Sequence, residues 1–214
     1  VGAKALEVDV WQRPQARTLF AYLALRSGQS VHAETICDAF WPGTDVKAAR
    51  ANLKTALARV RGALASVNPE DVRFEIDDDL VKLTLSGATW TDWSDVLAAD
   101  TAAHRLGDDM REARMQIAST ALGLARGEFL PEYRFDDWAT TMRERLDQAV
   151  QNLRSTYGAD LLAVGDFESG RMVGQAILDA DAFDEAGVRL MVQALTAQGG
   201  LDEARRIVRA YERR

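Results

Sequence analysis

The sequence predicts a mainly helical protein of two domains, a small α+β domain of residues 1–86 followed by an all-helical domain of residues 87–214. Three observations predict this architecture. Helical patterns near the N-terminus are followed by two strand patterns, helical spacing then runs almost unbroken from about residue 95, and the last part repeats at an offset of 34 residues. With 214 residues and 47% apolar content, the chain is long enough for each domain to bury a core.

The first helices of the N-terminal domain are indicated by apolar spacing and by Gly and Pro at their ends. We expect a strand over residues 5–11, where apolar and polar residues alternate. A helix over 16–29 should follow and stop at Gly28, as it would at a glycine C-cap. A short helix over 32–42, closed by proline, comes next.

A third helix and a β-hairpin complete the N-terminal domain. The helix, about twenty residues long, begins after Thr44 or Asp45, either of which has a side chain suited to cap it. Two runs of alternating apolar residues around an Asp turn predict the hairpin: Val72, Phe74 and Ile76, then Val81, Leu83 and Leu85. Strand, helix, helix, helix and hairpin in this order predict a winged helix-turn-helix.

The C-terminal domain is predicted from helical spacing with few interruptions. Breaks are expected near Gly107, within residues 127–133, and at Gly165 and Gly199. The segment that starts at Leu161 aligns with a later one at an offset of 34 residues, which is the period of tetratricopeptide repeats. The superposed pairs are Leu161 with Leu195, Gly165 with Gly199, Phe167 with Leu201, Arg171 with Arg205, and Ala176 with Ala210.

The third helix carries a charge opposite to that of the whole chain. The formal net charge is −7, yet residues 46–66 hold five cations and no acid: Lys47, Arg50, Lys54, Arg59 and Arg61. At about 100° per residue, one arc of roughly 80° is apolar and is expected to face the core: Val46, Ala49, Leu53, Leu57, Val60 and Leu64. The neighbouring arc of about 60° holds four of the cations, and Arg59 lies on the far side of the helix.

This helix is predicted to enter the major groove of DNA. A solvated helix face is the alternative, but such a face usually mixes both signs of charge. The five cations are expected to contact phosphates, and Arg50 also suits a base contact. Asn52 and Thr55 are expected to face base edges, while Ala48 and Ala51 leave room for a close approach.

The composition indicates neither a metal centre nor an active site. Cys37 is the single cysteine, which excludes an internal disulfide and a thiolate zinc site, and His32 and His104 are the only histidines. The sequence contains no phosphate-binding loop, dinucleotide fingerprint, zinc spacing or nucleophile elbow. We therefore expect no catalytic residue, no metal and no cofactor, and we do not expect an enzyme.

The sequence also lacks the features of an exported or membrane protein. It has no run of 18 or more apolar residues and no signal-peptide pattern, so we expect a cytoplasmic protein without a membrane partner. Residue 1 is Val rather than Met, and the last residues stop within a helical pattern. We therefore expect the sequence to be part of a longer chain.

Six segments, in order, resemble the Streptomyces antibiotic regulatory protein (SARP) family: ARTLFAYLALRSGQSV, ICDAFWP, AARANLKTALARVRGAL, ARGEFLPEY, DDWATTMRERL and GGLDEARRIVRAYE. The resemblance covers nearly the whole chain and implies an OmpR-type winged helix followed by a bacterial transcriptional activator domain (BTAD). It implies an activator that binds direct repeats in double-stranded promoter DNA and engages RNA polymerase. A homodimer on DNA stays open.

The predicted hairpin departs from what DNA binding favours. Its tip is acidic, with Glu75 and Asp77–Asp79, and only Arg73 and Lys82 at its base are cationic. Three explanations stay open: the hairpin is turned away from DNA, it faces a basic patch on polymerase, or the domain no longer binds DNA. The third explanation leads to an alternative function, a protein-interaction or signalling module.

Overall fold

The computed structural model describes residues 11, 13–65, 70–87 and 90–213. The protein is mainly helical with a small antiparallel sheet, and it divides into two compact units. The first unit comprises Val1–Trp90 and Phe135–Ala139, and the second comprises Thr91–Arg134 and Thr140–Arg214. Among the described residues, none of the helices has both the length and the hydrophobicity that a membrane crossing requires.

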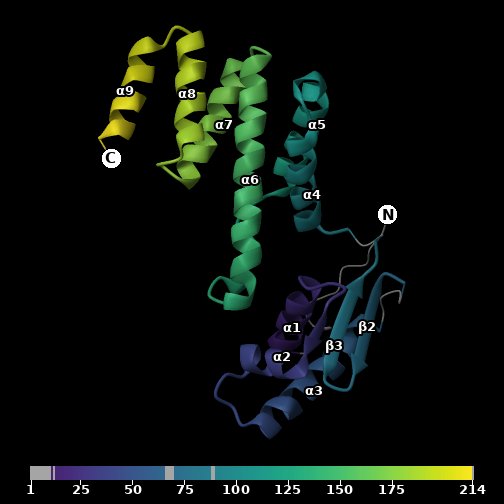
Figure 1. The fold of residues 1–214 in the computed structure, drawn as a ribbon. Coiled ribbons are helices and arrows are strands. Elements are labelled where there is room, and N and C mark those ends of the chain that lie inside the picture. The colour runs from purple at the N-terminus through teal and green to yellow at the C-terminus, as the bar shows by residue number, and fades with distance from the viewer. Residues whose placement is uncertain (1–10, 12, 66–69, 88–89, 214) are drawn as a thin grey trace. The chain divides into compact units, whose positions relative to one another are not determined.

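Within its described residues, the first unit contains three helices and a three-stranded sheet (Figure 1). In chain order these are α1 (Pro14–Ala24), β1 (Ser30–His32), α2 (Ala33–Phe40), α3 (Val46–Leu64), β2 (Val72–Asp77) and β3 (Leu80–Leu85). The sheet is antiparallel with the strand order β1-β3-β2. Its core is formed by side chains from all three helices and from β3, including Leu19, Leu23, Ile36, Val60 and Leu83.

Helix α1 is shorter than its apolar spacing predicts. It starts at Pro14. Proline has no backbone N–H, and in the first turn of a helix that N–H would have no partner within the helix. The helix buries Leu19, Tyr22 and Leu23. It ends at Ala24 rather than near Gly28, so the predicted C-terminus is wrong. Gly28 has a φ of +81°, and its N–H donates to the carbonyl of Leu83 at 2.9 Å. At Gly28 the chain therefore makes a backbone hydrogen bond to the sheet before β1 begins.

Strand β1 is absent from the sequence prediction. It pairs with β3 so that Val31 lies opposite Val81, and α2 begins immediately after it. A strand of three residues with one buried side chain has too few positions to show alternation, which is why sequence reasoning missed it. Residues 5–10 of the strand that was predicted instead lie outside the described residues.

The N-cap of α3 is Asp45, one of the two residues expected there, and the helix largely follows the predicted core face. The Asp45 carboxylate accepts hydrogen bonds from the N–H groups of Lys47 and Ala48 at 3.1 and 3.2 Å, as an N-cap does. The inner face buries Ala49, Leu53, Ala56, Leu57, Val60 and Ala63. Val46 was expected on this face but is 68% exposed, because it precedes the turns of α3 that pack on the core.

The hairpin has the register that the alternating pattern predicts. Phe74 lies opposite Leu83, and Ile76 lies opposite Val81. Asp77 pairs with Leu80, which leaves Asp78–Asp79 as a two-residue turn. Asp78 has a φ of +47°, a conformation that Asp tolerates better than most residues.

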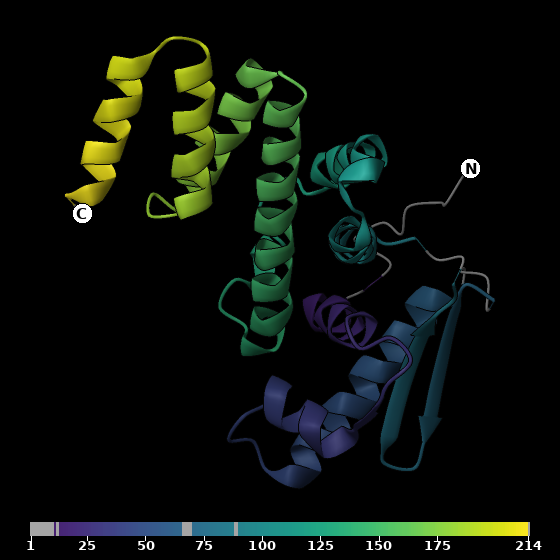
Figure 2. The same ribbon diagram turned by 45° about the horizontal axis from the view of Figure 1, so that its top comes forward.

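The second unit contains most of the helices (Figures 1 and 2). Its helices are α4 (Asp92–Arg105), α5 (Arg111–Leu124), α6 (Asp137–Ala163, from Thr140 onward), α7 (Phe167–Ala180), α8 (Glu185–Ala197) and α9 (Leu201–Glu212), with the single turns η2 (Asp108–Met110) and η3 (Pro131–Tyr133). Helix α4 packs against α5, and α7, α8 and α9 pack in succession. Four interruptions fall near the predicted breaks, and a further one at 181–184, between α7 and α8, was not predicted.

The 34-residue offset recurs in the backbone hydrogen bonds. At the end of α6, the N–H of Gly165 donates to the carbonyl of Leu162, and the next N–H donates to Leu161. At the end of α8, Gly199 and the residue after it make the same two bonds to Thr196 and Leu195. Both glycines are left-handed, with φ of +84° and +82°. Each turn is therefore a Schellman cap at the equivalent position.

Candidate nucleic-acid interface

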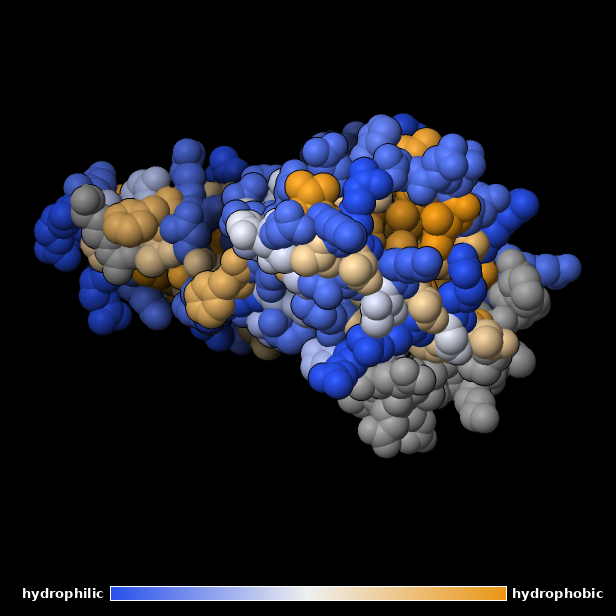
Figure 3. All heavy atoms as spheres, turned by 90° about the horizontal axis from the view of Figure 1, so that it is seen from below, coloured by the Kyte–Doolittle hydropathy of each residue, from blue (hydrophilic) through white to orange (hydrophobic). Residues whose placement is uncertain are grey.

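The exposed face of α3 carries nearly all the residues predicted to bind DNA. The exposed set is Lys47, Arg50, Ala51, Asn52, Lys54, Thr55 and Arg61. Arg59 is half-buried and lies about 180° around the helix from Arg50 and about 20° from Asn52, so it is apart from the other four cations. Figure 3, which views the molecule from below, shows a mostly hydrophilic surface with small hydrophobic areas bordered by polar ones.

A groove of about 560 Å³ lies between α3 and the hairpin. Its floor is apolar and includes Leu53, Leu57 and Val81. Cations of α3 line one wall, and Asp78 and Asp79 of the hairpin turn line the other. The acidic hairpin tip therefore faces the cationic side of α3.

An ion pair crosses this groove. Arg50 donates from Nη1 to Oδ1 of Asp79 at 2.7 Å and from Nη2 to Oδ2 at 3.2 Å. The hydrogen bonds from Arg50, and then its charge, hold the pKa of Asp79 below its ordinary value. The same bonds raise the pKa of Arg50. The side chains are 48% and 55% exposed, so solvent reaches the pair.

The remaining cations of this face are less constrained. Within the described part of the chain, neither Lys47 nor Lys54 has a carboxylate within ion-pair distance. The Arg61 guanidinium lies 5.8 Å from the centroid of the Phe74 ring, within the range of a cation–π contact. These long side chains can therefore reach an anion presented to α3.

The two polar residues of this face, Thr55 and Asn52, differ in which hydrogen-bonding groups stay available to a ligand. The Thr55 hydroxyl donates to the carbonyl of Ala51 at 3.0 Å, so its donor is used within the helix and its lone pairs remain available. Asn52 is exposed to solvent. Its amide can donate and accept at once, which suits it to a base edge.

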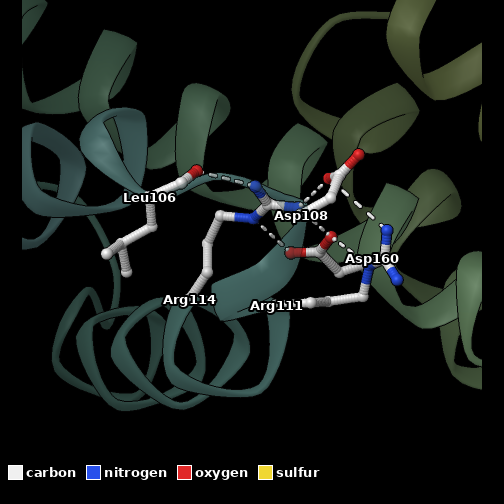
Figure 4. Close-up of polar contacts among 5 residues, drawn as sticks. All are labelled: Leu106, Asp108, Arg111, Arg114 and Asp160. Atoms are coloured by element: carbon white, nitrogen blue, oxygen red, sulfur yellow. Dashed lines mark hydrogen bonds and ion pairs between the residues drawn. The ribbon is translucent and has the colours of Figure 1, made fainter.

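The second unit contains a buried cluster of charged side chains (Figure 4). This cluster was not predicted from the sequence. Asp160 of α6 is 3% exposed and accepts from Nε and Nη2 of Arg114 at 2.8 and 2.5 Å. Arg111 lies 3.3 Å from the same carboxylate. Arg114 also donates to the Leu106 carbonyl and to Asp108.

The cluster joins three segments of the second unit rather than forming a reactive centre. The hydrogen bonds that Arg114 donates to Asp160, first, and to Asp108 raise the pKa of Arg114, and the bond from Arg114 lowers the pKa of Asp108. Arg114 and Asp108 are therefore held in their charged forms. Arg114 and Asp160 are 46 residues apart, and no spacing rule connects side chains over that distance.

Other candidate sites are weakly supported by the described residues. No three His, Cys, Asp or Glu side chains among them gather as metal ligands. Cys37 is 7% exposed, and burial raises the pKa of its thiol, so the reactive thiolate is disfavoured.

Comparison with solved structures identifies the architecture. The mainly helical fold with its small sheet is similar to that of a solved protein. That protein is Mycobacterium tuberculosis EmbR, solved in complex with a low-affinity phosphopeptide, and the TM-score is 0.77 at 18% sequence identity. The similarity covers 93% of this chain and 53% of the EmbR chain, so this chain spans about half the length of EmbR. No protein-family model and no curated protein sequence matches the chain.

Proposed function

We propose that the chain is a DNA-binding transcriptional activator related to the SARP family. The observation that carries this proposal is the exposed face of α3, where four cations lie beside small and polar residues and no acid is present. The order of elements in the first unit and the fold shared with EmbR support it. In this proposal the first unit is an OmpR-type winged helix, and the second is a BTAD with tetratricopeptide-like helices.

The proposed contacts divide by chemistry. Lys47, Lys54 and Arg61 bind phosphates, because long cationic side chains position a helix on the duplex. Asn52 and Thr55 face base edges in the major groove, which is about 12 Å wide and admits one α-helix. Arg59 is left out of the phosphate contacts because it is half-buried and lies about 180° around α3 from Arg50.

The second unit is proposed to serve protein contacts. Stacked helices with a repeating turn build extended surfaces for partners, and RNA polymerase at promoter direct repeats is the partner we propose. EmbR was solved with a phosphopeptide. We assign no such ligand to this chain, because the similarity covers only about half of EmbR. A non-enzymatic role in the cytoplasm, without a cofactor, follows from this function.

The test is binding of the chain to promoter-derived and random duplexes as salt is varied. Each phosphate neutralised contributes about −0.9 to the slope of log affinity against log salt. Lys54→Ala and Arg61→Ala should each weaken binding to all duplexes and reduce this slope by about one. Arg59→Ala is the control, because Arg59 is half-buried and lies about 180° around the helix from Arg50, away from Lys54 and Arg61, and it should leave the slope unchanged.

Sequence preference is tested separately with Asn52→Ala. This variant should change which sequences are selected from a random duplex pool while the salt slope stays close to that of the wild type. Binding that is independent of salt, or unaffected by Lys54→Ala, Arg61→Ala and Asn52→Ala together, would contradict the proposal.

The acidic hairpin turn supports a second candidate function, a protein-interaction or signalling module that no longer binds DNA. Asp78 and Asp79 line the groove beside α3 and would repel phosphates placed near the turn. Such a module should bind neither promoter-derived nor random duplexes even at low salt, so the same titration distinguishes the two functions.

A further inference from the structure

We propose that Asp79 is an intramolecular competitor for Arg50: its carboxylate occupies the end-on edge of the guanidinium, so that a nucleic-acid acceptor pair must displace Asp79 to take that edge. The proposal rests on the proposed function of the α3 face. It names a residue that regulates that face and gives the acidic hairpin turn a role that sequence reasoning did not consider.

The atoms in the pair carry the argument. Asp79 accepts from both Nη1 and Nη2 of Arg50, and Nε takes no part in the pair. An arginine reads the O6 and N7 acceptors of guanine, or two phosphate oxygens, with two N–H groups of one edge. The end-on edge is already bound in this structure. Only the side edge, formed by Nε and one Nη, stays open to a second acceptor.

The competitor is held in place by the backbone. The carbonyl of Asp79 accepts the N–H of Ala33, the first residue of α2, at 2.7 Å. The strand pair of Asp77 with Leu80 fixes the other side of the turn. The carboxylate is therefore presented to α3 by the fold, and it does not depend on the rotamer of a long side chain.

The pair is suited to exchange rather than to permanent closure. Both side chains are about half exposed, and exposed ion pairs are screened by water and salt. A polyanionic duplex supplies a stronger field than a single carboxylate. Displacing Asp79 therefore costs some of the free energy of duplex binding, and a correctly placed acceptor pair supplies it.

The experiment compares two substitutions that remove the same charge from the same turn. Asp79→Asn should tighten duplex binding about two- to fivefold at low salt, the range that an exposed ion pair allows. Asp78→Asn is the matched control, because Asp78 lines the same groove and makes no ion pair with Arg50. Its effect should be clearly smaller.

A double-mutant cycle identifies the partner. In the Arg50→Ala background, Asp79→Asn should give no more gain than Asp78→Asn, because the guanidinium that was released is absent. A comparison of duplexes with different sequences shows whether the acceptors that replace Asp79 belong to a phosphate or to a base. A gain shared by all duplexes indicates a phosphate, and a gain confined to duplexes with guanine at one position indicates a base.

Equal effects of Asp79→Asn and Asp78→Asn, or a gain that persists in the Arg50→Ala background, would overturn the competitor while leaving the proposed function intact. If no variant binds any duplex, the proposed function fails and the competitor fails with it. Carboxyl NMR titration of the free protein provides an independent check, since the pair should hold the pKa of Asp79 below the ordinary value for Asp.

Discussion

At the level of single residues, the most buried charge of the described chain lies far in sequence from its partners. Asp160 is 3% exposed, and Arg114 and Arg111 contact it. Removing one partner of a buried pair is costly, because the charge that remains is desolvated without compensation. The cluster therefore links η2, α5 and α6 and stabilises the second unit.

Asp160→Asn is expected to lower the free energy of unfolding by about 3 kcal/mol, because Arg114 and Arg111 lose their buried counter-charge. The matched control is Asp202→Asn. It removes a carboxylate that is 97% exposed and 3.7 Å from Arg205, and it should have little effect. Urea unfolding of both variants and the wild type measures the difference. Equal stabilities of the two variants would show that the cluster does not stabilise the fold.

Single residues also mark the limits of sequence reasoning about the site. The cationic face of α3 could be predicted because charge and helical spacing are local properties of the sequence. The Arg50–Asp79 pair could not, because it joins residues 29 positions apart through the packing of the hairpin on α3. Val46 was misplaced for a related reason, since a helical wheel does not show where the core ends.

At the level of elements, the two capped turns show that the repeat is structural as well as sequential. Gly165 and Gly199 adopt the same left-handed conformation and the same hydrogen bonds. The ion pairs Glu168–Arg171 and Asp202–Arg205 also recur at the 34-residue offset, in the first turns of α7 and α9. A repeat found from a few identities is therefore supported by backbone geometry.

Gly165→Ala and Gly199→Ala are expected to destabilise the protein by similar amounts, about 1 kcal/mol each, because a side chain in the left-handed region is strained. Neither position has an atom within 4 Å of the added Cβ, so strain is the only cost. Gly123→Ala in α5 is the control: it also has open space, but its backbone is helical, so it should be neutral or slightly stabilising. Thermal unfolding compares the three, and a Gly123→Ala loss as large as the other two would contradict the argument.

Element boundaries were predicted less well than element types. Helix α1 ends four residues before Gly28, and β1 was missed, because both outcomes depend on pairing with β3 rather than on local propensity. Features that rest on local chemistry agree with the prediction: Asp45, one of the two expected N-caps, starts α3, and the expected breaks at Gly165 and Gly199 lie at the ends of α6 and α8.

At the scale of the whole molecule, the mainly helical composition and the hairpin of the small sheet follow from periodicity, which is why they could be predicted. The packing distances within the second unit could not. A Cβ on Gly187 of α8 would lie 2.9 Å from side-chain atoms of Ile177 and Leu178 of α7. This glycine therefore sets how closely α7 and α8 approach.

Gly187→Ala is expected to reduce the free energy of unfolding by about 2 kcal/mol, because overpacking forces the neighbouring helix to move. Gly62→Ala in α3, where an added Cβ meets nothing within 4 Å, is the control and should not destabilise the protein. Calorimetry measures both. A Gly187→Ala variant as stable as the wild type would show that α7 and α8 can separate without cost.

The matched turns after α6 and α8 also determine which changes in length the second unit can absorb. Removing residues 166–199, a segment of 34 residues, would join the end of α6 to the start of α9 through a turn of unchanged chemistry. Helix α9 would then keep its rotation about its own axis relative to the helix before it. A deletion of another length would turn the apolar stripe of α9 toward water, so insertions and deletions here should be tolerated in whole modules.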